Sequence, residues 1–275
     1  MSLYQAVVLA VVQGFTEFLP ISSSAHLALA PWLFGWHDQG LIFDIGLHFG
    51  TLAAVLVYFF RDWVQIIAQG LGLPYQGKEE LRGNPRLLWL LTAGTVPVAV
   101  TGLVLEEYVE TVFRKPLPIG FMLIAVGLLM GVADRVGRRR KRLGEVSLRD
   151  CLVVGAAQAV AVIPGTSRSG ITITAALFRE FDREAAARFS FLLSTPAIGG
   201  AAVLAFKKLM EQGGVPPGMG APFVVGIIAS AATGCLVIAF FLRFLRRHSL
   251  KFFVHYRVIF GIIVIALALF RPPTG

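Results

Sequence analysis

The chain has 275 residues, of which 56% are hydrophobic and 15% charged, and its mean hydropathy is +0.74. This composition excludes an ordinary soluble domain and indicates a polytopic membrane protein. The formal net charge is +9, but the basic residues cluster between apolar segments, so we expect membrane lipids and no nucleic acid as partners.

The first half of the chain begins with a broken hydrophobic segment. An apolar helix is predicted over residues 3–19; it stops at Pro20, and Ser22–Ser24 can cap a second helix that runs to about Trp36. Both pieces are shorter than the roughly 20 apolar residues of a span, which predicts a re-entrant hairpin. Full spans are expected over residues 40–60, 87–105 and 117–134, with a charged loop over 61–86.

A second half repeats this order after the basic linker 135–149. A broken segment over 151–178 precedes expected spans over 185–206, 222–245 and 253–270. Gln158 followed by Pro164 resembles Gln13 followed by Pro20. Three full spans per half is an odd number, so the second half (150–275) is inverted relative to the first (1–134). We therefore predict one all-α integral membrane domain, an inverted-topology repeat with six transmembrane helices and two re-entrant helical hairpins.

Charge predicts the orientation of this repeat. Loops 61–86, 135–150, 179–188 and 243–257 hold 19 of the 25 lysines and arginines, which makes them cytoplasmic and puts both termini outside. The first hairpin then enters from the outer face and the second from the inner face. Their polar tips should meet near the midplane, where broken helices build ligand sites.

The tip of the second hairpin, Pro164–Thr172, places an arginine inside a hydrophobic segment. An ionised side chain there is a candidate functional residue. Arg168 would clamp a phosphate, with Ser167, Ser169 and Thr172 as hydrogen-bond donors beside a helix N-terminus that favours anions. The alternative is a capped loop whose arginine extends to the membrane surface.

The tip of the first hairpin offers a carboxylate, hydroxyls and an imidazole. Glu17 lies one helical turn after Gln13 and could be a general acid or base, a ligand of a hard cation, or simply the charge partner of the arginine. His26 could be a nucleophile, a base that activates Ser23 or Ser24, or a satisfied residue of a helix cap.

Two further polar residues lie at membrane depth. Asp44 and His48, one turn apart on the first full span, could support this centre from behind or pair with each other. An arginine clamp, a carboxylate and a hydroxyl or imidazole nucleophile together favour phosphoryl transfer.

Both tips carry a family resemblance. The stretches Gln13–His26 and Pro164–Thr172 resemble the two signatures of the bacterial undecaprenyl-diphosphate phosphatases of the bacitracin-resistance type, and Phe189–Leu193 extends the resemblance. It implies an enzyme of the bacterial cytoplasmic membrane that hydrolyses undecaprenyl diphosphate to undecaprenyl phosphate and inorganic phosphate, which recycles the carrier lipid for envelope synthesis. It also implies Mg²⁺ or Ca²⁺ as cofactor and a site that opens to the outer face.

By motif position, the resemblance assigns catalytic roles to Glu17, Ser23, His26 and Arg168 and phosphate contacts to Ser167 and Thr172; we add Ser24 and Ser169 as phosphate contacts. Gln13 stands where the family often has glutamate, so Glu17 and the diphosphate would have to hold any cation.

The sequence leaves several alternatives open. We favour attack by His26 with Ser23 orienting the phosphate, while Ser23 itself or a water is the alternative nucleophile. The rival function is a transporter or flippase of a lipid phosphate, because broken helices in inverted repeats are typical of transporters. A homodimer is one of the oligomeric states that the sequence allows.

Overall fold

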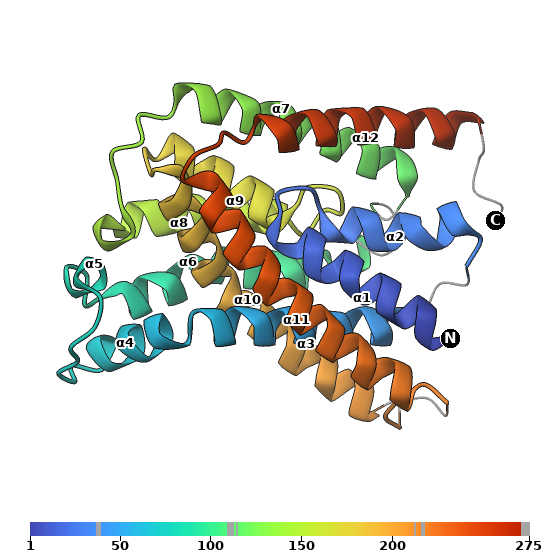
Figure 1. Ribbon diagram of the computed structural model, residues 1–275, viewed down its shortest axis with the longest axis horizontal. Helices are drawn as coiled ribbons and strands as arrows, with labels where there is room; N and C mark the ends of the chain where they lie inside the picture. Colours follow the sequence, from blue (N-terminus) through green and yellow to red (C-terminus); the bar gives the residue numbers. More distant parts are fainter. Residues whose placement is uncertain (37–39, 109–112, 114, 212, 216–217, 271–275) are drawn as a thin grey trace.

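The computed structural model describes residues 1–36, 40–108, 113, 115–211, 213–215 and 218–270, and these fold into packed helices (Figure 1). The described residues form no β-strand, only an isolated bridge between Lys141 and Phe181. The helices are α1 Leu3–Phe18, α2 Ser23–Phe34, α3 Gly40–Tyr58, α4 Phe60–Gly70, α5 Glu79–Arg82, α6 Leu87–Tyr108, α7 Pro116–Val136, the 3₁₀ turn η2 Leu143–Glu145, α8 Leu148–Val160, α9 Arg168–Phe178, α10 Arg183–Glu211, α11 Gly220–Leu245 and α12 Lys251–Phe270.

Five of these helices, α6, α7, α10, α11 and α12, are long and apolar enough to cross a membrane. They confirm apolar helices of span length at the five positions predicted, 87–105, 117–134, 185–206, 222–245 and 253–270. The span predicted over 40–60 is different, because α3 ends at Tyr58 and the chain continues as α4 after a bend of 74°. The bent pair brings the number of candidate spans to as many as six. The prediction of a loop from residue 61 onward was wrong, since α4 occupies its first part.

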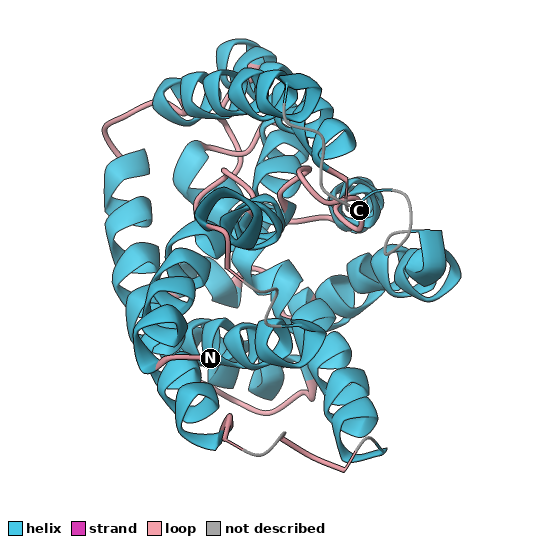
Figure 2. Cartoon of the chain, turned by 90° about the vertical axis from the view of Figure 1, so that its right-hand side faces the viewer, coloured by secondary structure: helices cyan, strands magenta, loops and turns pink. Residues whose placement is uncertain are grey.

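Both predicted helix breaks are present. α1 ends at Phe18, and Leu19 is extended before Pro20, whose ring prevents a continuous helix. α8 ends at Val160, and α9 begins at Arg168. α1 begins and α12 ends at one end of the molecule, while α5 lies at the other (Figure 1). Seen from the first of these ends, the helices surround several loop segments (Figure 2).

Glycines allow the broken helices to lie close to their neighbours. A Cβ at Gly14 of α1 would lie 2.7 Å from the Cβ of Thr233 in α11, and a Cβ at Gly155 of α8 would lie 2.1 Å from the carbonyl oxygen of Gly94 in α6. Small residues permit such backbone contact between membrane helices. α1 therefore packs along α11 in the same manner as α8 packs along α6.

Ion pairs fasten the end of the molecule that carries the basic loops. Arg183 Nε lies 2.6 Å from Asp134 Oδ1, and Arg179 Nε lies 2.7 Å from Asp150 Oδ1. Burial by itself would raise the pKa of Asp150, but hydrogen bonds from Ser147 and Arg179 outweigh it and lower this pKa. These arginines thus join the ends of neighbouring helices.

Candidate functional site

The two helix breaks meet, and their turns have matching local geometry. Ser22 and Ser167 each precede a helix and have positive φ angles of 79° and 68°, a region that non-glycine residues rarely adopt. The Ser22 hydroxyl accepts from the amide of Ala25 (3.4 Å), and the Ser167 hydroxyl accepts from the amide of Gly170 (3.1 Å). Each serine thus caps the helix that follows it. Backbone strain of this kind is concentrated at functional sites.

Direct hydrogen bonds join the two turns. Ser169 Oγ donates to the carbonyl oxygen of Leu19 (3.1 Å), and the amide of Gly165 donates to Ser24 Oγ (3.4 Å). The N-termini of α2 and α9 are consequently held next to each other, and both present backbone N–H groups. Such an arrangement favours a bound anion.

Glu17 is the centre of the polar cluster. Its Oε1 accepts from Arg168 Nη2 at 3.0 Å, and its Oε2 accepts from Ser23 Oγ at 2.6 Å and from Gln13 Nε2 at 3.1 Å. The side chain of Glu17 is 5% exposed, whereas that of Arg168 is 24% exposed, so the arginine remains accessible. The predicted proximity of Glu17 and Arg168 is confirmed.

Of the two residues predicted on the first full span, His48 lies near the polar cluster. His48 Nδ1 lies 2.7 Å from the carbonyl oxygen of Asp44, which assigns a proton to Nδ1 because a carbonyl only accepts. His48 Nε2 lies 3.8 Å from Glu17 Oε2. His48 therefore faces the carboxylate, and its hydrogen bond to Asp44 goes to the backbone.

The predicted phosphate-binding hydroxyls of α9 are already bonded within the protein. Thr172 Oγ1 donates to the carbonyl of Arg168 (2.7 Å) and lies 2.6 Å from Ser190 Oγ. Thr172 is 0% exposed and Ser169 is 4% exposed. In this geometry these two side chains shape the turn around Arg168.

His26 is held by partners other than Glu17 and Arg168. Its Nδ1 donates to the carbonyl of Ser22 (2.7 Å), so in the neutral imidazole its Nε2 accepts from the hydroxyl of Tyr256 (2.7 Å). Its ring also stacks on Phe260, with centroids 4.8 Å apart. Both ring nitrogens are thus occupied, whereas Ser23 is the hydroxyl in contact with the carboxylate.

Sequence reasoning missed Arg257 on α12. We counted it among the cytoplasmic loop residues, and that placement is wrong: its side chain is 0% exposed and lies between the two turns. It donates to the carbonyl oxygens of Pro20 (3.2 Å), Gly165 (2.9 Å) and Thr166 (3.0 Å). It also donates to Leu123 of α7 (3.2 Å). A signal was present, since Arg257 is the only charged residue of the span predicted over 253–270.

The residues around Glu17 offer a cation only part of a coordination shell. The described residues hold no group of three or more His, Cys, Asp or Glu side chains suited to a metal. Next to Glu17, however, Gln13 Oε1 is buried without a hydrogen-bond partner. Carboxylate and amide oxygens are ligands of Mg²⁺ and Ca²⁺. The donor set fits such a cation if substrate and water supply the remaining oxygens.

The fold and the site together define a polytopic helical membrane protein whose polar centre is an arginine–glutamate pair between two broken helices. Residues 6–263 match the family described as "Bacitracin resistance protein BacA". The chain belongs to this family.

Curated relatives carry one common name. The chain is 47% identical over 275 residues to an "Undecaprenyl-diphosphatase" of Desulforudis audaxviator, covering 98% of this chain and 100% of the relative. It is 49% identical over 269 residues to the protein of that name from Geobacter sulfurreducens, covering 97% and 98%. It is 46% identical over 267 residues to the protein of that name from Moorella thermoacetica, covering 97% of this chain and 98% of the relative.

Proposed function

We propose that this protein hydrolyses undecaprenyl diphosphate to undecaprenyl phosphate and inorganic phosphate. The name shared by relatives that match nearly the whole chain supports this function. The observation that carries the chemistry is the hydrogen-bonded series Ser23–Glu17–Arg168, in which a hydroxyl, a base and a cation occupy one cluster. A nucleophile within hydrogen-bond reach of a base, with the base held by a third group, is the arrangement expected for covalent catalysis.

Substrate binding uses the positive groups of the two turns. Arg168 turns from Glu17 toward the terminal phosphate and donates two hydrogen bonds to its oxygens. The N-terminal amides of α2 and α9 then stabilise the negative charge that accumulates on the phosphate in the transition state. Thr172 and Ser190 hold the first turn of α9, and with it Arg168, in place.

In the proposed reaction, Ser23 Oγ attacks the terminal phosphorus while Glu17 accepts the hydroxyl proton. The bond from that phosphorus to the bridging oxygen breaks, and undecaprenyl phosphate leaves with the electron pair. Glu17 passes its proton to the departing phosphate. A water then attacks the phosphorus of phosphorylated Ser23 and gives a proton to Glu17, the bond from phosphorus to Ser23 Oγ breaks, and Glu17 returns the proton to Oγ as inorganic phosphate leaves. This assignment replaces our preference for His26 as nucleophile, because Tyr256 donates to its Nε2.

Mg²⁺ or Ca²⁺ is part of the proposal. Glu17 and the free Oε1 of Gln13 would hold the cation together with phosphate oxygens of the substrate. When bound, the cation supplies further neutralisation of the phosphate charge. Chelation by EDTA should then reduce phosphate release, and added Mg²⁺ or Ca²⁺ should restore it.

The inverted repeat belongs to the same proposal. Three residues of the first broken segment have an identical residue 145 positions later in the second: Gln13, Ser22 and Ser24 correspond to Gln158, Ser167 and Ser169. The matching φ angles and caps of Ser22 and Ser167 support this register. We propose halves over 1–134 and 150–275, two re-entrant hairpins, and a site that faces the outside of the bacterial cytoplasmic membrane. A homodimer stays a prediction, which the mass of the detergent-solubilised protein tests.

Arg168→Ala tests the function. The variant should lose phosphate release from undecaprenyl diphosphate while still accumulating in membranes, because the Glu17 carboxylate keeps its hydrogen bonds from Ser23 and Gln13. Near-full activity in this variant would refute the assignment. Activity of the purified wild-type protein in detergent, without a gradient, excludes a protein that only transports.

Labelled phosphate locates the nucleophile. Rapid quenching should trap phosphorylated Ser23 in the wild type and no label in Ser23→Ala. A label on His26, or none under conditions that detect one turnover, would contradict attack by Ser23.

A further inference from the structure

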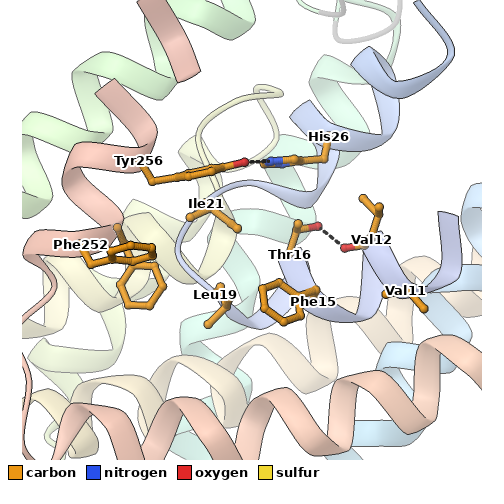
Figure 3. Close-up of a pocket in the computed structure, with 10 residues that line it drawn as sticks. Val11, Val12, Phe15, Thr16, Leu19, Ile21, His26, Phe252 and Tyr256 are labelled. Atoms are coloured by element: carbon orange, nitrogen blue, oxygen red, sulfur yellow. Dashed lines mark hydrogen bonds between the residues drawn. The ribbon is translucent and has the colours of Figure 1, made fainter. Parts of the chain in front are cut away.

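A cavity lies beside the polar cluster, between α1 and α12. Its volume is about 340 Å³. Its lining is almost wholly apolar: Val11, Val12, Phe15, Leu19 and Ile21 from the first broken segment, and Phe252 and Phe253 from α12. Thr16, His26 and Tyr256 are the remaining lining residues, and they are shown with the others in Figure 3.

The few polar groups in this wall are bonded to one another or to the backbone. Thr16 Oγ1 donates to the carbonyl of Val12 (2.7 Å). His26 is bonded at Nδ1 to Ser22 and at Nε2 to Tyr256 (Figure 3). Because these groups are already paired, the wall offers an occupant hydrocarbon contact and little else.

The cavity and the Glu17–Arg168 cluster lie on different sides of the segment that runs from α1 through the first turn into α2. Thr16 lines the cavity and Glu17 belongs to the cluster, and successive residues of a helix point about 100° apart. Farther along, Ile21 and His26 line the cavity, while Ser23, between them, donates to Glu17. A ligand with a phosphate head and a hydrocarbon tail could occupy both places across this segment.

An apolar stripe extends from the cavity along α1. Tyr4, Val7, Val11 and Phe15 lie on one helix face and are 71%, 40%, 43% and 46% exposed. Val11 and Phe15 form part of the cavity wall, so the stripe leads from it onto the outer surface of the helix. It provides a continuous route for a chain longer than the cavity can hold.

We infer that the cavity between α1 and α12 binds the isoprene units next to the diphosphate, and that the α1 stripe carries the chain farther from the head. The inference rests on the proposed function and adds the place where the lipid chain binds. Tyr256 and His26 line the part of the cavity that this chain occupies. Chain length is then recognised by α1 and α12 rather than by the phosphate-binding turns.

Val11→Trp fills the cavity from its exposed side, and Val100→Trp on α6 is the matched control, since Val100 is also an exposed valine (56%) and lies outside both the cavity lining and the α1 stripe. Val11→Trp should lower kcat/KM for farnesyl and undecaprenyl diphosphates about tenfold or more, since excluding two methylene-sized groups from an apolar site costs that factor. Turnover of dimethylallyl diphosphate should not change. Val100→Trp should resemble the wild type with all three substrates.

A farnesyl diphosphate analogue with a benzophenone at the chain end gives a test independent of turnover. After irradiation, labelled peptides should contain residues 11–21 or 252–256, and undecaprenyl diphosphate should prevent the labelling. Labelling that phospholipid prevents equally well would identify a general lipid groove and overturn the inference. So would labelling elsewhere, or equal effects of Val11→Trp on all three substrates. Failure of the wild type to release phosphate from undecaprenyl diphosphate would instead refute the proposed function.

Discussion

Arg257 should be needed for both turns of the site at once. In Arg257→Met, the side chain keeps much of its apolar length and loses every donor. The carbonyls of Pro20, Gly165 and Thr166, which lie outside the helices, then lose a buried partner. An unsatisfied buried carbonyl costs about 1–3 kcal/mol, so the three together cost roughly 3–9 kcal/mol. That is comparable with the roughly 5–15 kcal/mol that holds a whole domain folded.

The expected result is a fall in phosphate release of at least about 100-fold. A loss of about 3 kcal/mol or more in the stability of the active arrangement of the two turns reduces the population of that arrangement by this factor. The midpoint of thermal unfolding in detergent should fall as well. Arg257→Lys should retain part of the activity, since an ammonium group still donates but cannot reach all three carbonyls. Arg246→Met, which breaks an exposed pair with Glu184, is the control and should behave as wild type. Wild-type activity and melting in Arg257→Met would refute the reasoning.

Three other changes test the cation site, the helix packing and the loop anchors. Gln13→Glu sets a second carboxylate about where Gln13 Nε2 now lies, 3.1 Å from Glu17 Oε2. Because two carboxylates bind a divalent cation more tightly than one, the Mg²⁺ concentration for half-maximal activity should fall about tenfold or more. An unchanged concentration would contradict a cation site shared by residues 13 and 17. Gly155→Val forces side-chain atoms against the Gly94 carbonyl and should lower the melting midpoint, with activity following the loss of folded protein. The pKa of Asp150 is lowered in the folded protein, so its stabilising effect is present above the ordinary carboxyl pKa and lost as pH falls through the folded value. Asp150→Asn should therefore melt lower than wild type at pH 7, and the difference should shrink below about pH 4.

Local chemistry determined much of the fold from the sequence. Apolar stretches of span length predicted α6, α7, α10, α11 and α12, because a backbone in lipid must satisfy its own hydrogen bonds. Pro20 and the serines after it located the first break, and Pro164–Thr172 located the second. Arg168 was identified as a candidate functional residue because an ionised side chain within an apolar segment is rare unless it lines a cavity or binds a ligand.

Side-chain direction and partner choice were decided only by the tertiary structure. Nothing in the sequence distinguishes a histidine that faces Glu17 from one that faces α12, and it is Tyr256 and Phe260 that hold His26 on the side of the apolar cavity. Ser23, treated as a secondary candidate, is the hydroxyl that contacts the carboxylate.

Arg257 shows the same limit most clearly. From the sequence it was one more basic residue at the start of a span, where a charged side chain can reach water and indicates which end of the span is cytoplasmic. Packing of α12 against α7 instead buries its guanidinium between two turns that are 145 residues apart in the chain. The sequence by itself determined that a charged site lies where two helices break. Which side chains meet there depends on long-range packing, because backbone carbonyls brought together by the fold, and not neighbours in sequence, are the partners of Arg257.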